Sequence, residues 1–320
     1  MNYEIKYSKN INNLVSGGAG FLGSHLIDAL IKKNEKVICL DNYLSGQISN
    51  IEKWINHPNF EIIKHDVTEP IELDKKINKI WHLASPASPI YYKSNPIKTS
   101  RIIFLGTYNM LELARKKGAI LLLASTSEIY GNPEVNPQEE GYKGSVNTTG
   151  ERSCYDEGKR IAETLCSDYR RMHNLNIRIM RIFNTYGSRM RPDDGRVISN
   201  FISQALLGKS LTIYGNGSQT RSFCYVDDLI EGMISLMNSS LKTPVNIGNP
   251  EEFTIIELAN KIKKIINPKL DLIYKSLPED DPLQRKPDIS KARENLLWQP
   301  KINLDEGIKY TIDWFKKTYF

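Results

Sequence analysis

Short apolar runs alternate with longer amphipathic segments through the first part of the chain. The apolar runs are rich in isoleucine, valine and leucine and are bounded by glycine, asparagine, aspartate or serine, which is typical of buried strands. They begin at Asn12, Lys36, Phe60, Lys79, Ala119 and Ile177. The segments between them carry apolar residues at helical spacing. This alternation predicts a Rossmann-like, doubly wound α/β fold, in which helices cover both faces of a parallel sheet.

The alternation loosens after about Thr185, where loops rich in glycine, proline and aspartate separate further helical patterns. Helices are expected near 197–207, 226–237, 255–266 and 304–317. We therefore predict a dinucleotide-binding domain over residues 1–184 and a smaller mixed α/β lobe for the substrate over residues 185–320. A return to the first domain is expected near 221–250, where the run "PVNIGN" suits a further strand of the sheet.

Composition and charge argue against several classes of protein. The net charge of +6 is spread along the chain, which suits a small anionic substrate and, without a block of lysine or arginine, does not indicate nucleic acid. The longest apolar stretch, "AILLLAS", is too short to span a bilayer, so no membrane partner is expected. The four cysteines form no C-x-x-C pair and match no zinc pattern. They predict no metal site and a reducing, cytoplasmic location.

A glycine-rich loop follows the first expected strand and opens the first helix. The run "VSGGAGFLGSHL" places Gly17, Gly20 and Gly23 at three-residue spacing. In dinucleotide-binding folds the first glycine permits a tight turn, the second lets a diphosphate approach the backbone, and the third lets helix and strand pack closely. The helix N-terminus then faces the anionic diphosphate. The loop therefore predicts a dinucleotide site.

Two aspartates end the second and third expected strands. Asp41 is positioned to bind the adenosine ribose hydroxyls, and its charge would repel a 2′-phosphate. With no arginine directly after it, Asp41 predicts NAD rather than NADP. Asp66 suits the edge of the adenine ring, although a solvated strand end explains it as well.

Tyr155 and Lys159 stand one helical turn apart in "SCYDEGKRIAETL". At this spacing the phenol and the ammonium share one face of a helix. The lysine ammonium and the positive nicotinamide ring of an oxidised cofactor would both favour the phenolate and lower the pKa of the tyrosine, which would make Tyr155 a general base for a sugar hydroxyl. Such pairs are common on helix surfaces, so this pair indicates a catalytic site only if other site residues accompany it.

Those residues end the fifth expected strand, in "LLLASTSEIYG". The carboxyl edge of a parallel sheet is where ligands bind. Thr126 offers a hydroxyl to the reacting oxygen, and Ser127 and Glu128 can place a water, a proton or a carboxylate beside the sugar. We predict Thr126, Ser127, Glu128, Tyr155 and Lys159 as the catalytic set.

At this point the sequence resembles the extended short-chain dehydrogenase/reductases that act on nucleotide sugars, and within them the UDP-glucuronate decarboxylases. The runs that carry the resemblance are "HLASPASP", "STSEIYG", "CYDEGKRIAE", "RMRPDDGRVISNFI" and "YGNGSQTRSF". The resemblance implies NAD as cofactor. It also implies oxidation of the substrate at C4 with Tyr155 as base, loss of carbon dioxide from the 4-keto sugar, and reduction of the resulting ketone to UDP-xylose with internal recycling of NADH.

The resemblance also implies two sets of binding residues. For NAD they are Gly17, Gly20, Phe21, Leu22, Gly23, Asp41, Asn42, Asp66, Val67, Leu83, Ala84, Ser85, Ala124, Tyr155 and Lys159. For UDP-glucuronate they are Asn184, Arg191, Arg196, Tyr214, Arg221 and Arg285. Within the second set, Asn184 and Arg285 are expected at the diphosphate, Arg221 at the diphosphate or the carboxylate, and Tyr214 at uracil or ribose. Arginine suits both phosphate and carboxylate because two N–H groups bind at once.

Relatives with other activities share much of this machinery. Nucleotide-sugar 4-epimerases and 4,6-dehydratases remain alternatives, although related dehydratases are expected to have an acid where this chain has Ser127. The family also has a polar Thr-Asn pair where this chain has Ile102 and Ile103. That change would remove hydrogen bonds near the active-site lysine. A further alternative is therefore a sensor, which binds NAD and nucleotide sugar but turns over slowly.

Small residues recur on the helix of Tyr155. Cys154, Gly158 and Ala162 would permit close packing either against the symmetric partner of a homodimer, as the resemblance implies, or against another part of the same chain.

Overall fold

The computed structural model describes residues 12–277 and 284–320. The first eleven residues of the predicted 1–184 domain lie outside this description. A seven-stranded sheet forms the centre of the larger part, and all of its strands are parallel. Its order is β11-β6-β5-β4-β1-β2-β3. The strands span Asn12–Ser16 (β1), Lys36–Asp41 (β2), Phe60–Lys64 (β3), Lys79–His82 (β4), Ile120–Thr126 (β5), Ile177–Ile182 (β6) and Val245–Ile247 (β11).

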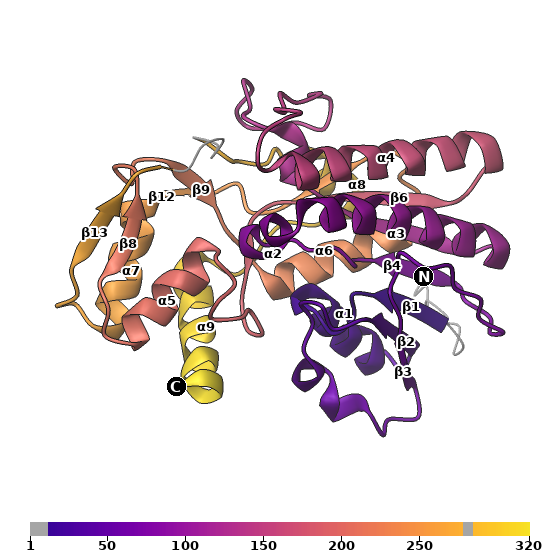
Figure 1. Ribbon diagram of the computed structural model, residues 1–320, viewed down its shortest axis with the longest axis horizontal. Coiled ribbons are helices and arrows are strands. Elements are labelled where there is room, and N and C mark those ends of the chain that lie inside the picture. The colour runs from indigo at the N-terminus through magenta and orange to yellow at the C-terminus, as the bar shows by residue number, and fades with distance from the viewer. Residues whose placement is uncertain (1–11, 278–283) are drawn as a thin grey trace, which may run out of the picture.

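Helices cover both faces of this sheet, which confirms the predicted Rossmann-like class (Figure 1). One face carries α2 (Pro89–Ser94), α3 (Pro96–Lys117) and α4 (Ser153–His173), and the other carries α1 (Phe21–Lys32) and α6 (Val226–Asn238). Within the described residues, three short 3₁₀ helices lie in the connections: η1 (Ile48–Asn50), η2 (Glu52–Trp54) and η3 (Ser127–Tyr130).

Alternate residues of each strand enter opposite cores. Leu14 and Ile80 belong to the core beneath α3 and α4, whereas their neighbours Val15 and Trp81 belong to the core beneath α1 and α6. All four side chains have no exposed surface. Because successive side chains of a strand point to opposite faces, a strand that is apolar throughout is stable only when both faces are covered. The continuous apolar runs of the sequence therefore required the two helical layers.

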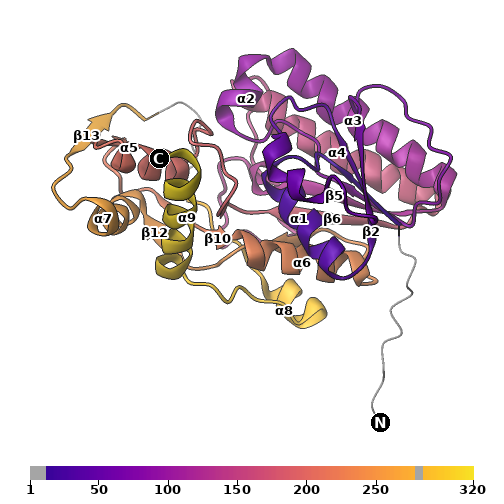
Figure 2. The same ribbon diagram turned by 90° about the horizontal axis from the view of Figure 1, so that it is seen from below.

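The remaining elements form a smaller mixed lobe beside the sheet (Figure 2). Its helices are α5 (Val197–Leu206), α7 (Ile255–Ile266), α8 (Ser290–Leu296) and α9 (Leu304–Tyr319). Its strands pair as β8 (Leu211–Tyr214) with β13 (Leu272–Lys275), β9 (Thr220–Ser222) with β12 (Glu252–Thr254), and β7 (Thr185–Tyr186) with β10 (Cys224–Tyr225). α8 packs on β11 and α6, so this helix joins the lobe to the sheet.

The chain passes into this lobe after β6 and returns to the sheet at α6 and β11. β11 pairs in parallel with β6, with Asn246 opposite Arg181. The division of the chain at residues 184 and 185 stays a prediction. Within the described residues, none of the helices combines the length and the apolar character that crossing a membrane requires.

Candidate active site

A cavity of about 720 Å³ lies at the carboxyl ends of the strands, between the sheet and the smaller lobe. The strand order reverses between β1 and β4, and ligands of open parallel sheets bind in the crevice at such a reversal. Every predicted site residue except Asp66 lines the cavity. The structure thus brings together residues that are more than 250 positions apart in the chain, from Gly17 to Arg285.

The glycine loop forms the cavity wall after β1. A Cβ on Gly23 would lie 2.1 Å from the carbonyl oxygen of Gly17, so the helix and the loop approach too closely for any side chain. At Gly17 a Cβ would lie 2.9 Å from the backbone of Ala84. A Cβ on Gly20 would contact just the Gly17 oxygen, at 3.1 Å, and would otherwise project into open space. That space is what a dinucleotide diphosphate needs, so the loop fits the predicted cofactor.

Asp41 anchors the loop from the end of β2. Its carboxylate accepts hydrogen bonds from the backbone N–H groups of Ala19, at 2.9 Å, and Tyr43, at 2.8 Å. Burial raises the pKa of Asp41, and these backbone donors oppose the shift. Asp66 instead accepts from Asn42 Nδ2, at 3.0 Å, and from both donors of Thr68. It holds its own turn beside the cavity, and its predicted adenine contact stays a prediction.

Tyr155 and Lys159 face the cavity from α4. Both side chains are buried, and Nζ of Lys159 lies 5.8 Å from the centroid of the Tyr155 ring. The same ammonium donates a hydrogen bond of 2.8 Å to the backbone oxygen of Ala124 on β5. The i, i+4 spacing therefore gives the predicted juxtaposition, and β5 fixes the direction of the lysine.

The predicted lowering of the Tyr155 pKa, which depends on the lysine and on an oxidised nicotinamide together, stays a prediction for the cofactor-bound site. Burial raises the pKa of the phenol above its ordinary value, and a hydrogen bond with Thr126 opposes that rise. Burial also lowers the pKa of Lys159 to about 8, against the opposing charge of Glu163. In the protein without cofactor, the desolvation of both groups outweighs the effect of neighbouring charges. Tyr155 is thus a neutral phenol until a ligand changes its surroundings.

Glu128 lies at the end of β5 between two arginines. Arg152 donates to Oε2 of Glu128, and Nη2 of Arg285 reaches the same oxygen at 3.2 Å. Burial opposes ionisation, but the charges of Arg285, Arg152 and Arg221 together hold the pKa of Glu128 below its ordinary range. Glu128 is therefore a carboxylate that accepts hydrogen bonds. Of the three groups that Ser127 and Glu128 were expected to place beside the sugar, a water, a proton or a carboxylate, these surroundings favour the carboxylate for Glu128.

Two residues that the sequence analysis did not select complete this region. Arg152 stands three residues before Tyr155, one turn back on the same side of the helix, so its spacing could have drawn attention to it. Tyr92 stacks on Tyr155 with ring centroids 5.1 Å apart and planes 9° apart. Both line the cavity. No sequence signal marks Tyr92, because its partner lies 63 positions away.

The predicted substrate arginines divide into two kinds. Arg191 and Arg196 lie on the loop before α5, pair with Asp193 and Asp194, and stand over aromatic rings. Arg285 is 1% exposed and donates to the backbone oxygens of Ser127 and Gly131 as well as to Glu128. Its contacts belong to the catalytic end of the cavity, beside Glu128. The predicted diphosphate role of Arg285 has no support in these contacts.

The other predicted substrate residues lie on the smaller lobe's side of the cavity. Arg221 is buried in β9, Tyr214 is half exposed at the end of β8, and Asn184 lies between β6 and β7. The roles predicted for these residues stay predictions.

Ile102 and Ile103 are both buried on α3. Ile102 lines the cavity, whereas Ile103 packs against α4, where a Cβ on Gly158 would lie 3.0 Å from its Cδ1 atom. Ala162 is likewise fully buried. Gly158 therefore serves packing within the chain, which was one of the two interpretations that the sequence left open, and it provides no surface for a partner.

Comparison with known proteins places this geometry among nucleotide-sugar enzymes. Residues 14–311 match the family model described as GDP-mannose 4,6 dehydratase. UDP-glucuronic acid decarboxylase 3 of Arabidopsis thaliana is 57% identical over 301 residues, which cover 93% of this chain and 87% of the relative. UDP-glucuronic acid decarboxylase 1 of Danio rerio is 53% identical over 304 residues, which cover 95% of this chain and 72% of the relative.

Solved structures agree with the fold. UDP-glucuronic acid 4-epimerase from Bacillus cereus, in complex with UDP-glucuronic acid and NAD, superposes with a TM-score of 0.88 at 28% identity and covers 97% of this chain and all of its own. UDP-glucose 4-epimerase from Thermotoga maritima, with UDP-glucose, gives a TM-score of 0.89 at 28% identity and the same coverage.

Proposed function

This chain belongs to the GDP-mannose 4,6-dehydratase family, and from that premise and the geometry of its cavity we propose that it converts UDP-glucuronate to UDP-xylose. The observation that carries the proposal is the meeting of Thr126, Tyr155 and Lys159 with Ser127 and Glu128 at one end of the cavity. The identity to UDP-glucuronic acid decarboxylases extends over nearly the whole chain, so it includes both the glycine loop and the smaller lobe.

The cofactor is NAD, and the cavity wall at Gly17, Gly20 and Asp41 would hold it. When bound, NAD reversibly accepts a hydride from C4 of the sugar, and the positive charge of its oxidised ring favours the tyrosinate. Asp41 contributes a carboxylate at the ribose end of the cavity, and its negative charge disfavours a 2′-phosphate there.

Tyr155 exchanges one proton with the C4 hydroxyl of the sugar. Thr126 hydrogen-bonds to the phenol, and Lys159 holds a positive charge behind it at neutral pH. The C4 carbonyl that forms lies β to the sugar's carboxylate, so the C5–C6 bond can break with its electron pair passing into this carbonyl, which releases carbon dioxide and gives an enolate. A proton from solvent then adds at C5 and gives the ketone, whose reduction at C4 completes UDP-xylose. The hydroxyls of Thr126 and Tyr155 stabilise the enolate oxygen, which is a stronger acceptor than the hydroxyl of the substrate.

Ser127 and Glu128 distinguish this site from one that expels a hydroxyl group. Glu128 is held as a carboxylate by Arg152 and Arg285, so it keeps these arginines in place and does not act as an acid. Ser127 places a neutral side chain where an additional acid would repel the carboxylate of glucuronate. The cationic groups around Glu128 favour an anionic sugar at this end of the cavity.

The test is a product assay with the purified chain, UDP-glucuronate and a catalytic amount of NAD. Release of one carbon dioxide for each UDP-xylose, with no net NADH, is the expected result. UDP-galacturonate without carbon dioxide would show a 4-epimerase instead. Tight binding of both ligands without any product would show the slow-turnover sensor.

We also propose that the chain acts as a cytoplasmic homodimer. Support for the dimer comes from half-exposed apolar side chains on the outer surface of α3 and α4: Phe104, Tyr108 and Ile161. Support for the location comes from the four cysteines, all of which are free, as expected in a reducing compartment. Sedimentation of the purified chain and of Phe104→Glu tests the dimer, and fractionation of the producing cells tests the location.

A further inference from the structure

The active-site lysine has a buried anionic neighbour that the mechanism above does not use. Glu163 follows Lys159 by one helical turn on α4, so both side chains lie on the same face. Its carboxylate accepts from Arg181 Nε, at 3.0 Å, and Nη2, at 2.8 Å, and from Ser125 Oγ, at 2.5 Å. A bidentate pair with a third donor fixes both oxygens of Glu163 between α4, β5 and β6.

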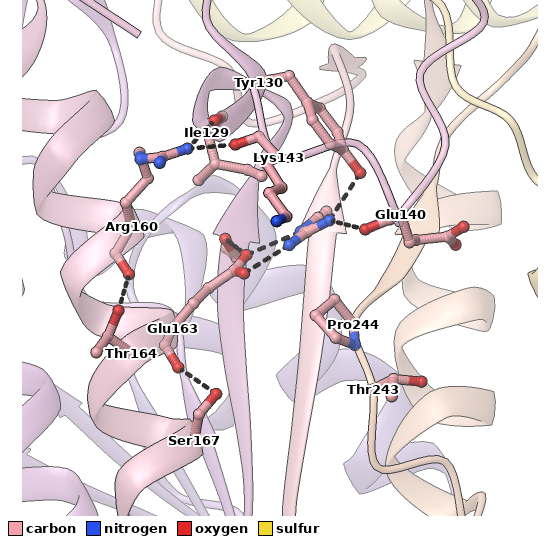
Figure 3. A network of polar contacts seen from close by, with 12 residues as sticks. Ile129, Tyr130, Glu140, Lys143, Arg160, Glu163, Thr164, Ser167, Thr243 and Pro244 are labelled. Atoms are coloured by element: carbon pink, nitrogen blue, oxygen red, sulfur yellow. Dashed lines mark hydrogen bonds and ion pairs between the residues drawn. The ribbon is translucent and has the colours of Figure 1, made fainter. Parts of the chain in front are cut away.

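Arg181 is itself held in place from its other side. Nη1 of Arg181 donates to the hydroxyl of Tyr130, at 3.0 Å, and to the backbone oxygen of Glu140, at 2.9 Å. Tyr130 in turn donates to Asn246 on β11, at 2.7 Å. Figure 3 shows the side chains of Glu163 and Tyr130 pointing into the same space between α4 and the strands, where their dashed bonds meet. The network therefore connects the helix of the catalytic pair to the far edge of the sheet.

The groups that surround Lys159 differ in charge. Tyr155 and Cys166 on α4 are neutral, because burial raises the pKa of each. His82 on β4 is neutral too, because burial lowers its pKa to about 3 and Lys159 adds to that shift. From α3, Ile102 lines the same cavity, and from β5 the contact is the oxygen of Ala124. Of all these groups, Glu163 is the one that offsets the burial of Lys159 most strongly.

We propose that Glu163 is a positioning residue for the catalytic lysine: Arg181 and Ser125 hold its carboxylate where it keeps the Lys159 ammonium charged beside Tyr155. The inference rests on the proposed function for its catalytic consequence, but the charge of Lys159 can be measured without any turnover. Burial alone would release the lysine's proton near neutral pH, and a neutral amine would no longer stabilise a tyrosinate.

The central variant is Glu163→Gln, which removes the charge and keeps the shape. An opposite charge at this spacing shifts a pKa by roughly 1–3 units, so we expect Lys159 to titrate at least about one unit lower than the wild type. The upper limb of kcat against pH, where activity falls as Lys159 loses its proton, moves to lower pH by the same amount. Glu157→Gln is the matched control, because Glu157 lies on the same helix but pairs with Arg160 at the surface.

Two readouts separate this role from a merely structural one. The first is the pH profile of kcat. The second is the NMR titration of ¹³C-labelled lysine in the protein without ligands, with the Lys159 signal identified from Lys159→Arg. Glu163→Asp, which keeps the charge, should restore most of the titration shift. A uniform loss of activity at every pH in Glu163→Gln, with an unchanged Lys159 titration, would overturn the inference.

A second variant covers the case in which Glu163→Gln does not fold. The double substitution Glu163→Met/Arg181→Met leaves neither member of the pair buried without its partner, and such apolar replacements are often tolerated. It should also lower the pKa of Lys159, and an unchanged titration there contradicts the proposal. If the wild type releases no carbon dioxide while the titration shift is present, the proposed function fails and the role of Glu163 stands.

Discussion

The two ends of the cavity are built in different ways. The cofactor end is built mainly from the backbone of one loop, with Gly17, Gly20 and Gly23, and from the carboxylate of Asp41. The neutral pair Ser16 and His82, on the neighbouring strands β1 and β4, shares a hydrogen bond of 2.8 Å. The substrate end consists of charged side chains from distant segments, with Glu128, Arg152 and Arg285 in one cluster. Substitutions that change the shape of a residue should therefore affect mainly the cofactor end, and substitutions that change its charge should affect mainly the substrate end.

The largest effect is expected where the two ends meet. Tyr155→Phe removes the group that exchanges a proton with the sugar and leaves the ring stacked on Tyr92. General acid–base catalysis contributes about 10²–10⁴-fold, so carbon dioxide release should fall by at least about a hundredfold. NAD affinity, measured by calorimetry, should stay within about twofold, because a single hydroxyl is lost from a large binding surface. Wild-type turnover in this variant would remove Tyr155 from the mechanism.

Charge at the substrate end is tested by Arg285→Met against Arg191→Met. Arg285 is buried beside Glu128, and removing one partner of a buried ion pair costs up to about 3–5 kcal/mol. Because Arg152 still pairs with Glu128, we expect the lower end of this range. Arg191 pairs with Asp193 at the surface, where such pairs contribute about 0–1 kcal/mol. Urea denaturation should show this difference. Equal losses of unfolding free energy in the two variants would contradict the division between buried and surface arginines.

Shape at the cofactor end is tested by Gly23→Ala against Gly20→Ala. The added methyl at Gly23 would collide with backbone, so we expect a loss of about 1–3 kcal/mol of unfolding free energy. At Gly20 the φ angle is −75° and the space is open, so the fold should tolerate the methyl, which then enters the diphosphate region and weakens NAD binding. Thermal unfolding with and without NAD separates the two effects. Unchanged NAD affinity in Gly20→Ala would place the diphosphate elsewhere.

The neutral groups at the cofactor end should make stability depend on pH. Burial lowers the pKa of His82 to about 3, against about 6.5 in an unfolded chain. The unfolded state therefore binds more protons between these values, and stability is full above pH 6.5 and falls as the pH drops towards 3. The slope from this residue is at most about 1.4 kcal/mol per pH unit. His82→Asn should flatten that slope, whereas His173→Asn, on the exposed end of α4, should not.

Much of the cofactor end could be predicted from the sequence. The glycine spacing, the apolar runs and Asp41 depend on local geometry. The apolar runs form the strands of the sheet, and the glycines and Asp41 line the cavity. The substrate end could be predicted less completely. Arg152 and Tyr92 were missed, and the contacts of Arg285 with Ser127, Glu128 and Gly131 were not predicted, because these side chains act through partners on other elements.

Local chemistry thus determined the fold of this protein. Strands that are apolar throughout must be covered on both faces, and a loop without Cβ atoms must approach another backbone, whichever residues lie elsewhere. The tertiary structure decided the protonation states. Whether Tyr155 is a phenol, Lys159 an ammonium and Glu128 a carboxylate depends on desolvation and on charges that arrive from other strands and helices. The free energies of desolvation and of charge–charge interaction depend on burial and on distances in space, and these cannot be deduced from the sequence alone.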